Sequence, residues 1–505
     1  MPSQRRSGVV LGYANVATKN LVNLAYVPML LSFVGRSDYG VYQSCNSFVF
    51  SLALLSFGFS QAYVRFYTQK KVHGTESDIR RLNGVYLVLY MAVSALALGL
   101  GLVFAANASA VFSTGFTAEE VSLAGSVMSL MACNIAVTLF NSVFDAHMLA
   151  RERFRFQQTR QLGSTLATPL IVYLLLCAGT GVVGVAAAQL AVNVVLLGLN
   201  AIFCVGHLGM RFDVRHFDKV LFRSIAAFSA WIFANQVCDL INQNVPNVLL
   251  GALSGASAVA VFAVSVQIRS VFMSLSTVMS NVFTPKINKI VAESDDNVVL
   301  TDLMARVGRY QMLLFCWVYG GFAVLGRFFL ASWAGDGFED VYWLVLVMVA
   351  PLAFPLTQNT GIDIQRAKNR HKARSVVYLV AAVANLAITA SLAGRYGYWA
   401  PVAGYVFYVL FACGLFMNWY YQKRIGLDMV LFWKRVLPVA ACGVAATVAC
   451  LLGSSLLPVT GWVSFAAWGC AYSAIYAALA LALAADGAER KALRNAAARL
   501  ARRNP

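Results

Sequence analysis

The chain is a succession of long apolar runs separated by short polar connections. Fourteen of these runs are long enough to cross the roughly 30 Å hydrocarbon core of a bilayer as helices. Their approximate limits are 10–33, 39–66, 83–106, 121–148, 161–179, 182–207, 224–252, 257–284, 307–330, 341–364, 375–394, 397–420, 436–457 and 461–485. The pattern predicts an all-α polytopic membrane protein with about 14 transmembrane helices. Glycine and polar residues mark several connections, at 34–38, 178–181 and 334–337.

Two halves of the chain resemble each other. Ala-Arg-Glu-Arg at 150–153 is similar to Ala-Lys-Asn-Arg at 367–370. Pro28 and Pro246 have nearly the same separation along the chain as these two segments, and each proline precedes a short apolar run and a glycine. Because six spans separate the equivalent positions, the copies have the same orientation in the membrane. The predicted divisions are a six-helix lobe at 1–215, a second at 216–425, an extra helix pair at 426–485 and a basic tail at 486–505.

The basic residues follow the same alternation. The chain is 60% hydrophobic and carries a net charge of +18 from 39 Lys and Arg, of which 33 lie in every second connection or at the termini. The intervening connections hold only Arg36, Arg327 and Arg395. Positive charge on alternate loops is typical of the cytoplasmic side of helical membrane proteins, so we predict that both termini are cytoplasmic. Topology explains the positive charge, and nucleic acid is not predicted as a partner.

A polar stripe in the first run suggests a hydrated cleft. Lys19 lies about nine residues into this run, or roughly 13 Å from its start at 1.5 Å per residue. Asn15, Asn23 and Tyr26 are spaced to share its helical face. A charge near the bilayer centre needs water or a partner, so we predict that this stripe lines a cavity. Snorkelling or a structural ion pair of Lys19 remains the alternative.

Three other runs carry comparable stripes. Asp239 and Asn242 lie in the seventh run and Arg269 in the eighth, while the fourth holds Asn134, Thr138, Asn141 and Asp145. Such residues can line a cleft, but Asn and Ser also join helices by hydrogen bonds, and an Arg269–Asp239 ion pair is a structural alternative. Arg65, at the cytoplasmic end of the second run, suits interface anchoring as well as binding.

Four residues are candidates for gating or coupling. Asp145 and Asp363 each precede a basic connection, where structural ion pairs or an inner gate are expected ahead of proton coupling. Pro28 and Pro246 are expected to kink their helices and free backbone carbonyls.

The residue pattern favours a transporter over an enzyme. The ten cysteines occur singly within apolar stretches, and the five histidines have no paired ligands, so no disulfide, metal site or cofactor is predicted. No catalytic motif occurs, and the largest outer segment, near 107–120, is short. Lys19 and Arg269 instead favour an anionic cargo such as a phosphate or pyrophosphate, and the nearby Asn, Gln and Tyr groups suit sugar hydroxyls.

Several segments carry a family resemblance. YVPMLLSFVG at 26–35, DYGVY at 38–42 and LLSFGF at 54–59 resemble bacterial polysaccharide flippases, as do Asp239-Leu-Ile, AVFA at 260–263 and Pro285. These O-antigen-type and exopolysaccharide repeat-unit translocases share a superfamily with multidrug-and-toxin extruders and the lipid II flippase. The resemblance is recognisable from the start of the chain to shortly after Pro285.

The resemblance implies two six-helix lobes that form a V around a cationic cavity. It implies alternating access that moves an undecaprenyl-pyrophosphate-linked oligosaccharide from the cytoplasmic to the periplasmic leaflet of the inner membrane. Lys19 and Arg269 match positions that bind pyrophosphate in related flippases, and Arg65 matches loosely. A polysaccharide polymerase and a chain-length regulator are the protein partners it suggests. Two alternatives stay open, a secondary exporter of a soluble amphipathic compound and a membrane polymerase or ligase of the same pathway.

Overall fold

The computed structural model describes residues 2–56, 58–112, 114–214, 219–281, 283, 287, 290–291, 293–368, 370 and 372–484, with the backbone alone at some helical positions. The regular structure in these ranges is helical, which confirms the predicted all-α class. The chain forms two compact units. Unit 1 comprises 1–264 and 382–404, and unit 2 comprises 265–381 and 405–505. The predicted tail at 486–505 lies outside the described residues.

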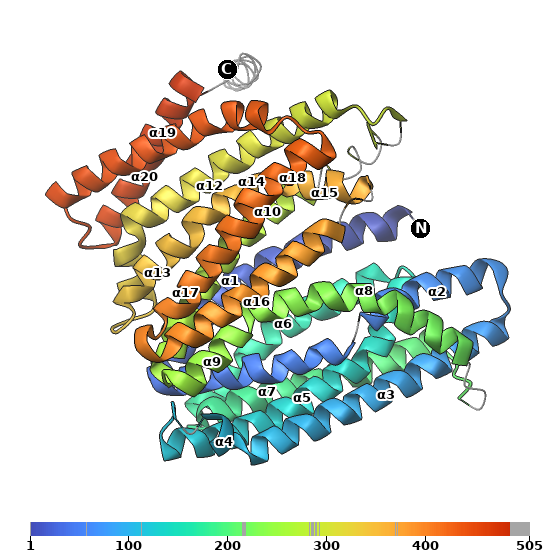
Figure 1. Ribbon diagram of the computed structural model, residues 1–505. Coiled ribbons are helices and arrows are strands. Elements are labelled where there is room, and N and C mark those ends of the chain that lie inside the picture. The colour runs from blue at the N-terminus through green and yellow to red at the C-terminus, as the bar shows by residue number, and fades with distance from the viewer. Residues whose placement is uncertain are drawn as a thin grey trace, which may run out of the picture. The chain divides into compact units, whose positions relative to one another are not determined.

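Unit 1 is built from the helices of the N-terminal half (Figure 1). They are α1 (Pro2–Ser51), α2 (Phe59–His73), α3 (Glu76–Ala106), α4 (Ala108–Phe112), α5 (Ala118–Ala150), α6 (Phe154–Cys177), α7 (Gly181–Ile202), α8 (Lys219–Gln243), α9 (Val245–Leu253) and the start of α10 (Ala256–Asn281). Parts of α16 (Lys372–Tyr396) and α17 (Trp399–Tyr408) complete it. Helix α5 packs against α3 and α7, and α1 packs against α6.

Two long helices of unit 1 begin at capping boxes. The Thr75 side chain accepts a hydrogen bond from the Asp78 amide at 3.3 Å, while the Asp78 carboxylate accepts one from the Thr75 amide at 2.9 Å. Thr117 and Glu120 repeat this reciprocal pair at the start of α5. Both boxes satisfy amides that a helix start leaves without partners, so they define where α3 and α5 begin.

Unit 2 contains the remaining helices. They are α12 (Asn297–Trp333), α13 (Glu339–Val349), α14 (Ala353–Thr357), α15 (Asn359–Ala367), α18 (Met417–Tyr420), α19 (Met429–Leu456) and α20 (Trp462–Leu479), with π-helical turns η4 (Val409–Phe416), η5 (Tyr421–Ile425) and η6 (Ala480–Ala484). Helix α12 packs along α19, which also packs on α20. Asp296 and Asp428 cap α12 and α19 by accepting backbone amide hydrogen bonds.

The glycines at the three predicted connections break the helices. Gly35, inside the long α1, has φ +73°, and Gly179 and Gly181 have φ +78° and +56°. Gly335 and Gly337 have φ +80° and +85°. Left-handed backbone is readily available only to glycine, so these positions end one span and start the next.

The predicted count of 14 spans is not confirmed. The described residues contain 12 helices that are long and apolar enough to cross a membrane. The first two predicted runs fall in one continuous stretch, Thr18–His73, although Gly35 interrupts its helical geometry. The seventh run, 224–252, is divided between α8 and α9 at the break before Pro246, and neither helix is among these 12.

The two halves repeat the same local backbone design. Arg153 donates its amide to the Met148 carbonyl at 2.9 Å, and Arg370, at the equivalent place in the second half, donates to the Gln365 carbonyl at the same distance. A π-helical turn at Phe203–His207 (η2) is followed by a glycine at φ +64°, and η5 is followed by a glycine at φ +86°. This recurrence supports the duplication inferred from the sequence. The lobe boundaries at 215 and 425 stay a prediction.

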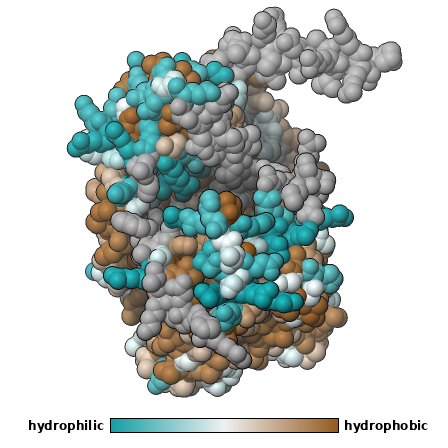
Figure 2. Space-filling model, turned by 90° about the vertical axis from the view of Figure 1, so that its right-hand side faces the viewer, coloured by the Kyte–Doolittle hydropathy of each residue, from teal (hydrophilic) through white to brown (hydrophobic). Residues whose placement is uncertain are grey.

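Hydrophilic side chains lie at the end of unit 1 where α2 joins α3. Figure 2 looks onto this end, and many hydrophilic residues, drawn in teal, are visible on it. The connection there carries Lys70, Lys71, Arg80 and Arg81. This is one of the connections that the charge pattern assigns to the cytoplasm.

Candidate functional site

The polar stripe of α1 has two different environments in unit 1. Asn15 is buried, and its amide donates to the Gln158 carbonyl at 2.8 Å and to Gln158 Oε1 at 2.7 Å. Asn15 therefore holds α1 against α6. Lys19, one turn further on, is exposed, and Asn23 is half-buried. Arg65 on α2 is also exposed.

Arg269 is the most confined of the candidate cations. It lies on the unit 2 part of α10, its side chain is 3% exposed, and its guanidinium carbon sits 4.0 Å from the centre of the Tyr405 ring. Neither Nε nor Nη1 has a hydrogen-bond partner among the described residues. The aromatic face stabilises the positive charge without using its N–H donors.

This arrangement is chemically suited to an oxyanion. A buried guanidinium with unsatisfied donors is unfavourable by several kcal/mol in a low-dielectric surrounding, roughly what a buried unpaired charge costs. A phosphate or pyrophosphate accepts N–H hydrogen bonds from a guanidinium, so its oxygens would supply partners for the atoms that the protein leaves unpaired. Tyr405 would hold the planar group in a fixed orientation.

Asp145 belongs to a separate polar cluster in unit 1. Its carboxylate forms an ion pair with Arg160 at 2.9 Å. The Asn141 amide donates to it at 3.3 Å, and the Asn200 amide lies 3.5 Å from it. The cluster joins α5 to α6 and α7. Asp145 therefore takes part in a structural ion pair, one of the roles that the sequence suggests for it. A role in gating stays a prediction.

The rest of the α5 stripe joins helices. Asn193 donates to Asn134 and Asn200 donates to Asn141, each at 2.7 Å, so two asparagine pairs one heptad apart connect α7 to α5. Thr138 donates to the Asn134 carbonyl at 2.8 Å. The two asparagine pairs join neighbouring helices, and the Thr138 bond lies within α5. The asparagines of this stripe thus join helices by hydrogen bonds, which was the alternative to lining a cleft.

The remaining candidates are dispersed. Asn242 is buried and accepts a hydrogen bond from Asn385 at 2.9 Å, whereas the Asp239 side chain lies outside the described residues. Asp363 lies 3.8 Å from Arg366 on the same turn of α15.

The two prolines differ in their local geometry. Pro246 is at the start of α9, directly after the break that ends α8. Helical geometry continues through Pro28, since Gly35 is the residue of α1 with non-helical angles. Only Pro246 therefore accompanies an interruption of its helix.

Three residues that complete these sites had no clear signal in the sequence. Gln158 and Arg160 follow a basic connection, and the alternation of charge alone explains a basic residue at position 160. Tyr405 is one aromatic residue among many in an apolar run. Its role depends on the packing of α17 against α10, which spacing does not give. Among the described residues no group of three His, Cys, Asp or Glu side chains could hold a metal ion.

Comparisons with known proteins place this fold. The lipid II flippase MurJ in an inward closed conformation superimposes with a TM-score of 0.74 at 13% identity, over 93% of this chain and 98% of that one. An inward-facing multidrug resistance MATE family transporter of the MOP superfamily gives a TM-score of 0.63 at 15% identity, over 81% of this chain and 94% of the other. The chain therefore has the helical fold of MOP superfamily transporters, as the sequence resemblance implied.

The sequence family is narrower than the fold. The family model described as "Polysaccharide biosynthesis protein" matches residues 30–342, and the chain belongs to this family. The chain is also 22% identical to the uncharacterized membrane protein EpsK of Bacillus subtilis (strain 168) over 474 residues, 92% of each protein. The prediction of a membrane transporter in polysaccharide biosynthesis is thus supported by family and fold together.

Proposed function

We propose that the protein is an alternating-access flippase for lipid-linked oligosaccharide repeat units. It moves an undecaprenyl-pyrophosphate-linked glycan from the cytoplasmic to the periplasmic leaflet for surface polysaccharide assembly, as O-antigen, capsule or exopolysaccharide. The observation that carries this proposal is Arg269, a buried guanidinium fixed on Tyr405 with two unpaired donor atoms. Membership of a polysaccharide biosynthesis family supports the glycan part of the cargo.

Arg269 of unit 2 and Lys19 of unit 1 each have a separate role toward the anion. Arg269 offers a planar fork that accepts a phosphoryl group in one orientation. Lys19 offers a compact charge on an exposed part of α1, which suits capture of a hydrated headgroup. Asn23 and Asn242 supply amide groups for sugar hydroxyls. Arg65 adds a positive charge at the predicted entrance, and Asp363 and Pro246 belong to elements that change shape between states.

The distribution of basic residues supports the direction of transport. The positive-inside rule assigns both termini and the alternate basic connections to the cytoplasmic side of the inner membrane. The cargo is anionic and is loaded from this side, so a cytoplasmic surface of net positive charge raises its local concentration. The partner that this function requires is the lipid-linked substrate, and a polymerase and a chain-length regulator are the protein partners that the family resemblance suggests.

Two other functions would give a null strain a different phenotype. An exporter of soluble amphipathic compounds would leave glycan display intact and increase drug sensitivity. A polymerase or ligase would leave single repeat units exposed on the periplasmic side. The flippase predicts that complete repeat units accumulate on the cytoplasmic side of the membrane.

The cellular test uses a strain that depends on this protein for its surface glycan. The variants Lys19→Ala and Arg269→Ala should each reduce glycan display, and the double variant should abolish it, at unchanged protein level. Arg327→Ala is the matched control because its guanidinium also lies over aromatic rings, 5.1 Å from that of Tyr342, but at the predicted outer end. Full display in the double variant would reject the cationic site.

A further inference from the structure

A groove on unit 2 has no part in the proposed transport site. It has a volume of about 870 Å³ and lies between α14, η4 and α18 on one side and α19 on the other. We propose that this groove binds an anionic phospholipid of the bilayer, with one acyl chain along the groove and the headgroup phosphate beside Lys434. The inference does not depend on the cargo of the transporter.

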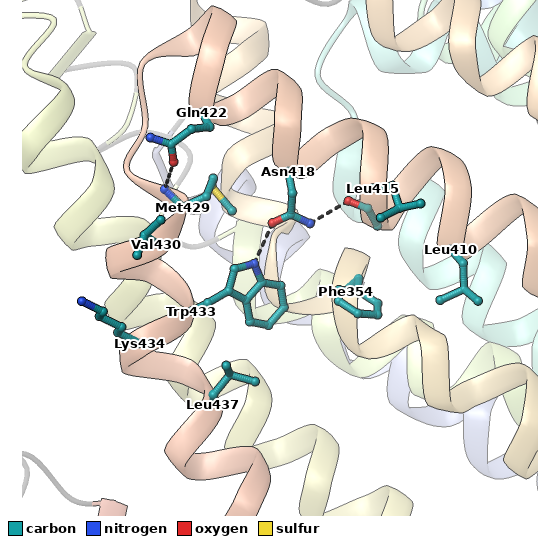
Figure 3. Close-up of a pocket in the computed structure, with 11 residues that line it drawn as sticks. Phe354, Leu410, Leu415, Asn418, Gln422, Met429, Val430, Trp433, Lys434 and Leu437 are labelled. Atoms are coloured by element: carbon teal, nitrogen blue, oxygen red, sulfur yellow. Dashed lines mark hydrogen bonds between the residues drawn. The ribbon is translucent and has the colours of Figure 1, made fainter.

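The lining is suited to a hydrocarbon chain. Phe354, Leu410, Leu415, Val430 and Leu437 contribute apolar surface (Figure 3). Leu415 is 71% exposed and Val430 is 60% exposed, so apolar surface is open to whatever surrounds the helices. A sugar or a hydrated ion would lose hydrogen bonds with water against such walls, whereas an acyl chain would lose none.

The aromatic wall is held in position by hydrogen bonds. The Trp433 indole N–H donates to Asn418 Oδ1 at 2.6 Å, and the Asn418 amide donates to the Gly414 carbonyl at 2.7 Å (Figure 3). Gln358 donates to the same Asn418 oxygen at 3.0 Å. The polar edge of the indole is thus engaged within the protein, which leaves the ring to line the groove.

The absence of a side chain at position 414 keeps the groove open. Gly414 lines it within the π-helical turn η4. A Cβ atom built there would meet Phe354 Cδ2 at 3.8 Å, an ordinary contact distance. Alanine is therefore sterically acceptable at this position, while a larger side chain would extend toward Phe354 and fill the space.

One end of the groove is positively charged. Lys434 lines it, and its amino group points away from the Trp433 ring in Figure 3. The segment from Gln422 to Leu437 contains four basic residues and one acidic residue, Asp428. Asp428 is occupied as the cap of α19, where it accepts the Leu431 amide at 2.9 Å. Arg435 is paired with Asp302, so Lys434 supplies the positive charge that lines the apolar groove. This charge complements an acyl chain with an anionic headgroup.

The size of the groove is compatible with this occupant. A volume of about 870 Å³ lies in the range of roughly 300–1,000 Å³ found for small-molecule sites. It suits one chain and the adjoining glycerol better than a complete two-chain lipid, so the second chain would stay in the bilayer. The bound lipid would connect α19 to η4 and α18, and so hold the extra helix pair against the rest of unit 2.

The test measures lipid binding to the purified full-length protein. Native mass spectrometry is performed with dioleoyl phosphatidylglycerol and dioleoyl phosphatidylcholine at equal concentration. The wild type should retain more phosphatidylglycerol than phosphatidylcholine. Lys434→Gln should weaken that binding about fivefold, the equivalent of about 1 kcal/mol per basic residue at a membrane surface. Lys372→Gln, an exposed lysine outside the groove, is the control and should have no effect.

A second pair of variants tests the apolar part independently of charge. Gly414→Leu should abolish retention of phosphatidylglycerol, and Gly414→Ala should preserve it. Equal retention of the two lipids by the wild type, or an unchanged affinity in both Lys434→Gln and Gly414→Leu, would overturn the proposal. Displacement of phosphatidylglycerol by equimolar polyprenyl phosphate would also overturn it, because the groove would then belong to the cargo.

Discussion

Arg160 and Asp145 form an ion pair in which Arg160 Nη2 lies 2.9 Å from the carboxylate, and the two side chains are only 10% and 32% exposed. Breaking a buried ion pair by removing one partner is costly because the other charge stays buried without compensation. Asp145→Asn should therefore lower the free energy of unfolding by an amount toward the lower end of roughly 3–5 kcal/mol. Thermal unfolding in detergent measures this change.

The double variant separates structure from gating. Asp145→Asn combined with Arg160→Gln removes both charges and should recover part of the lost stability. If Asp145→Asn melts like the wild type but no longer transports, the ion pair is not structural and the gating role is supported instead.

The glycines that follow the π-helical turns η2 and η5 predict a second set of effects. Gly209→Ala should destabilise by about 1–2 kcal/mol, because its φ of +64° disfavours a side chain although its surroundings are open. Gly426→Ala should cost at least as much, since its Cβ would also lie 2.5 Å from Asn297 Nδ2. Gly206→Ala, in open space without a positive φ, should be neutral or slightly stabilising. Equal melting temperatures for all three variants would contradict this account.

Hydrogen bonds from Arg309 attach the extra helix pair to α12. The Arg309 side chain is buried and donates to the Arg435 carbonyl at 2.8 Å and to the Ala484 carbonyl at 2.7 Å. Arg309→Met should leave both carbonyls without this donor and speed hydrogen exchange at the C-terminal ends of α20 and η6. Arg306→Ala, an exposed position one turn away, is the control. Unchanged exchange in Arg309→Met would show that packing alone holds the pair.

The Arg269–Tyr405 contact predicts a graded loss of anion binding. Tyr405→Phe keeps the ring and should bind a short-chain polyprenyl pyrophosphate nearly as well as the wild type. Tyr405→Leu removes about 0.5–2 kcal/mol of cation–π stabilisation and should weaken binding about 2- to 30-fold. Arg269→Lys keeps the charge but loses the planar fork, so its affinity should fall between wild type and Arg269→Ala. Stronger binding by Tyr405→Leu than by Tyr405→Phe would contradict the role of the ring.

The sequence predicts the fold better than the sites because apolar run length is a local property. Each span needs about 20 apolar residues, and glycines such as Gly35 and Gly335 mark the breaks where left-handed backbone occurs. The count of 14 is not confirmed at two places among the described residues, each for a local reason. Gly35 separates spans that otherwise form one helical stretch, and the break before Pro246 divides the seventh run.

Side-chain partners are less predictable because a stripe shows which residues share a face and not what that face contacts. Asn15 and Lys19 are one turn apart, yet one is buried against Gln158 and the other is exposed. The charge pattern explains Arg160 by membrane topology, whereas in the structure it forms an ion pair with Asp145. Tyr405 and Arg269 lie in different spans far apart in the chain, and no periodicity joins such positions.

The most direct test of the central claim is flipping of a fluorescent undecaprenyl-pyrophosphate oligosaccharide in proteoliposomes. Reduction of outer-leaflet fluorescence by a membrane-impermeant quencher reports which leaflet holds the label. We expect the wild type and Arg327→Ala to exchange the label between leaflets. The double variant Lys19→Ala/Arg269→Ala should exchange the label no faster than liposomes without protein. Wild-type rates in the double variant would contradict the claim that these two cations bind the pyrophosphate.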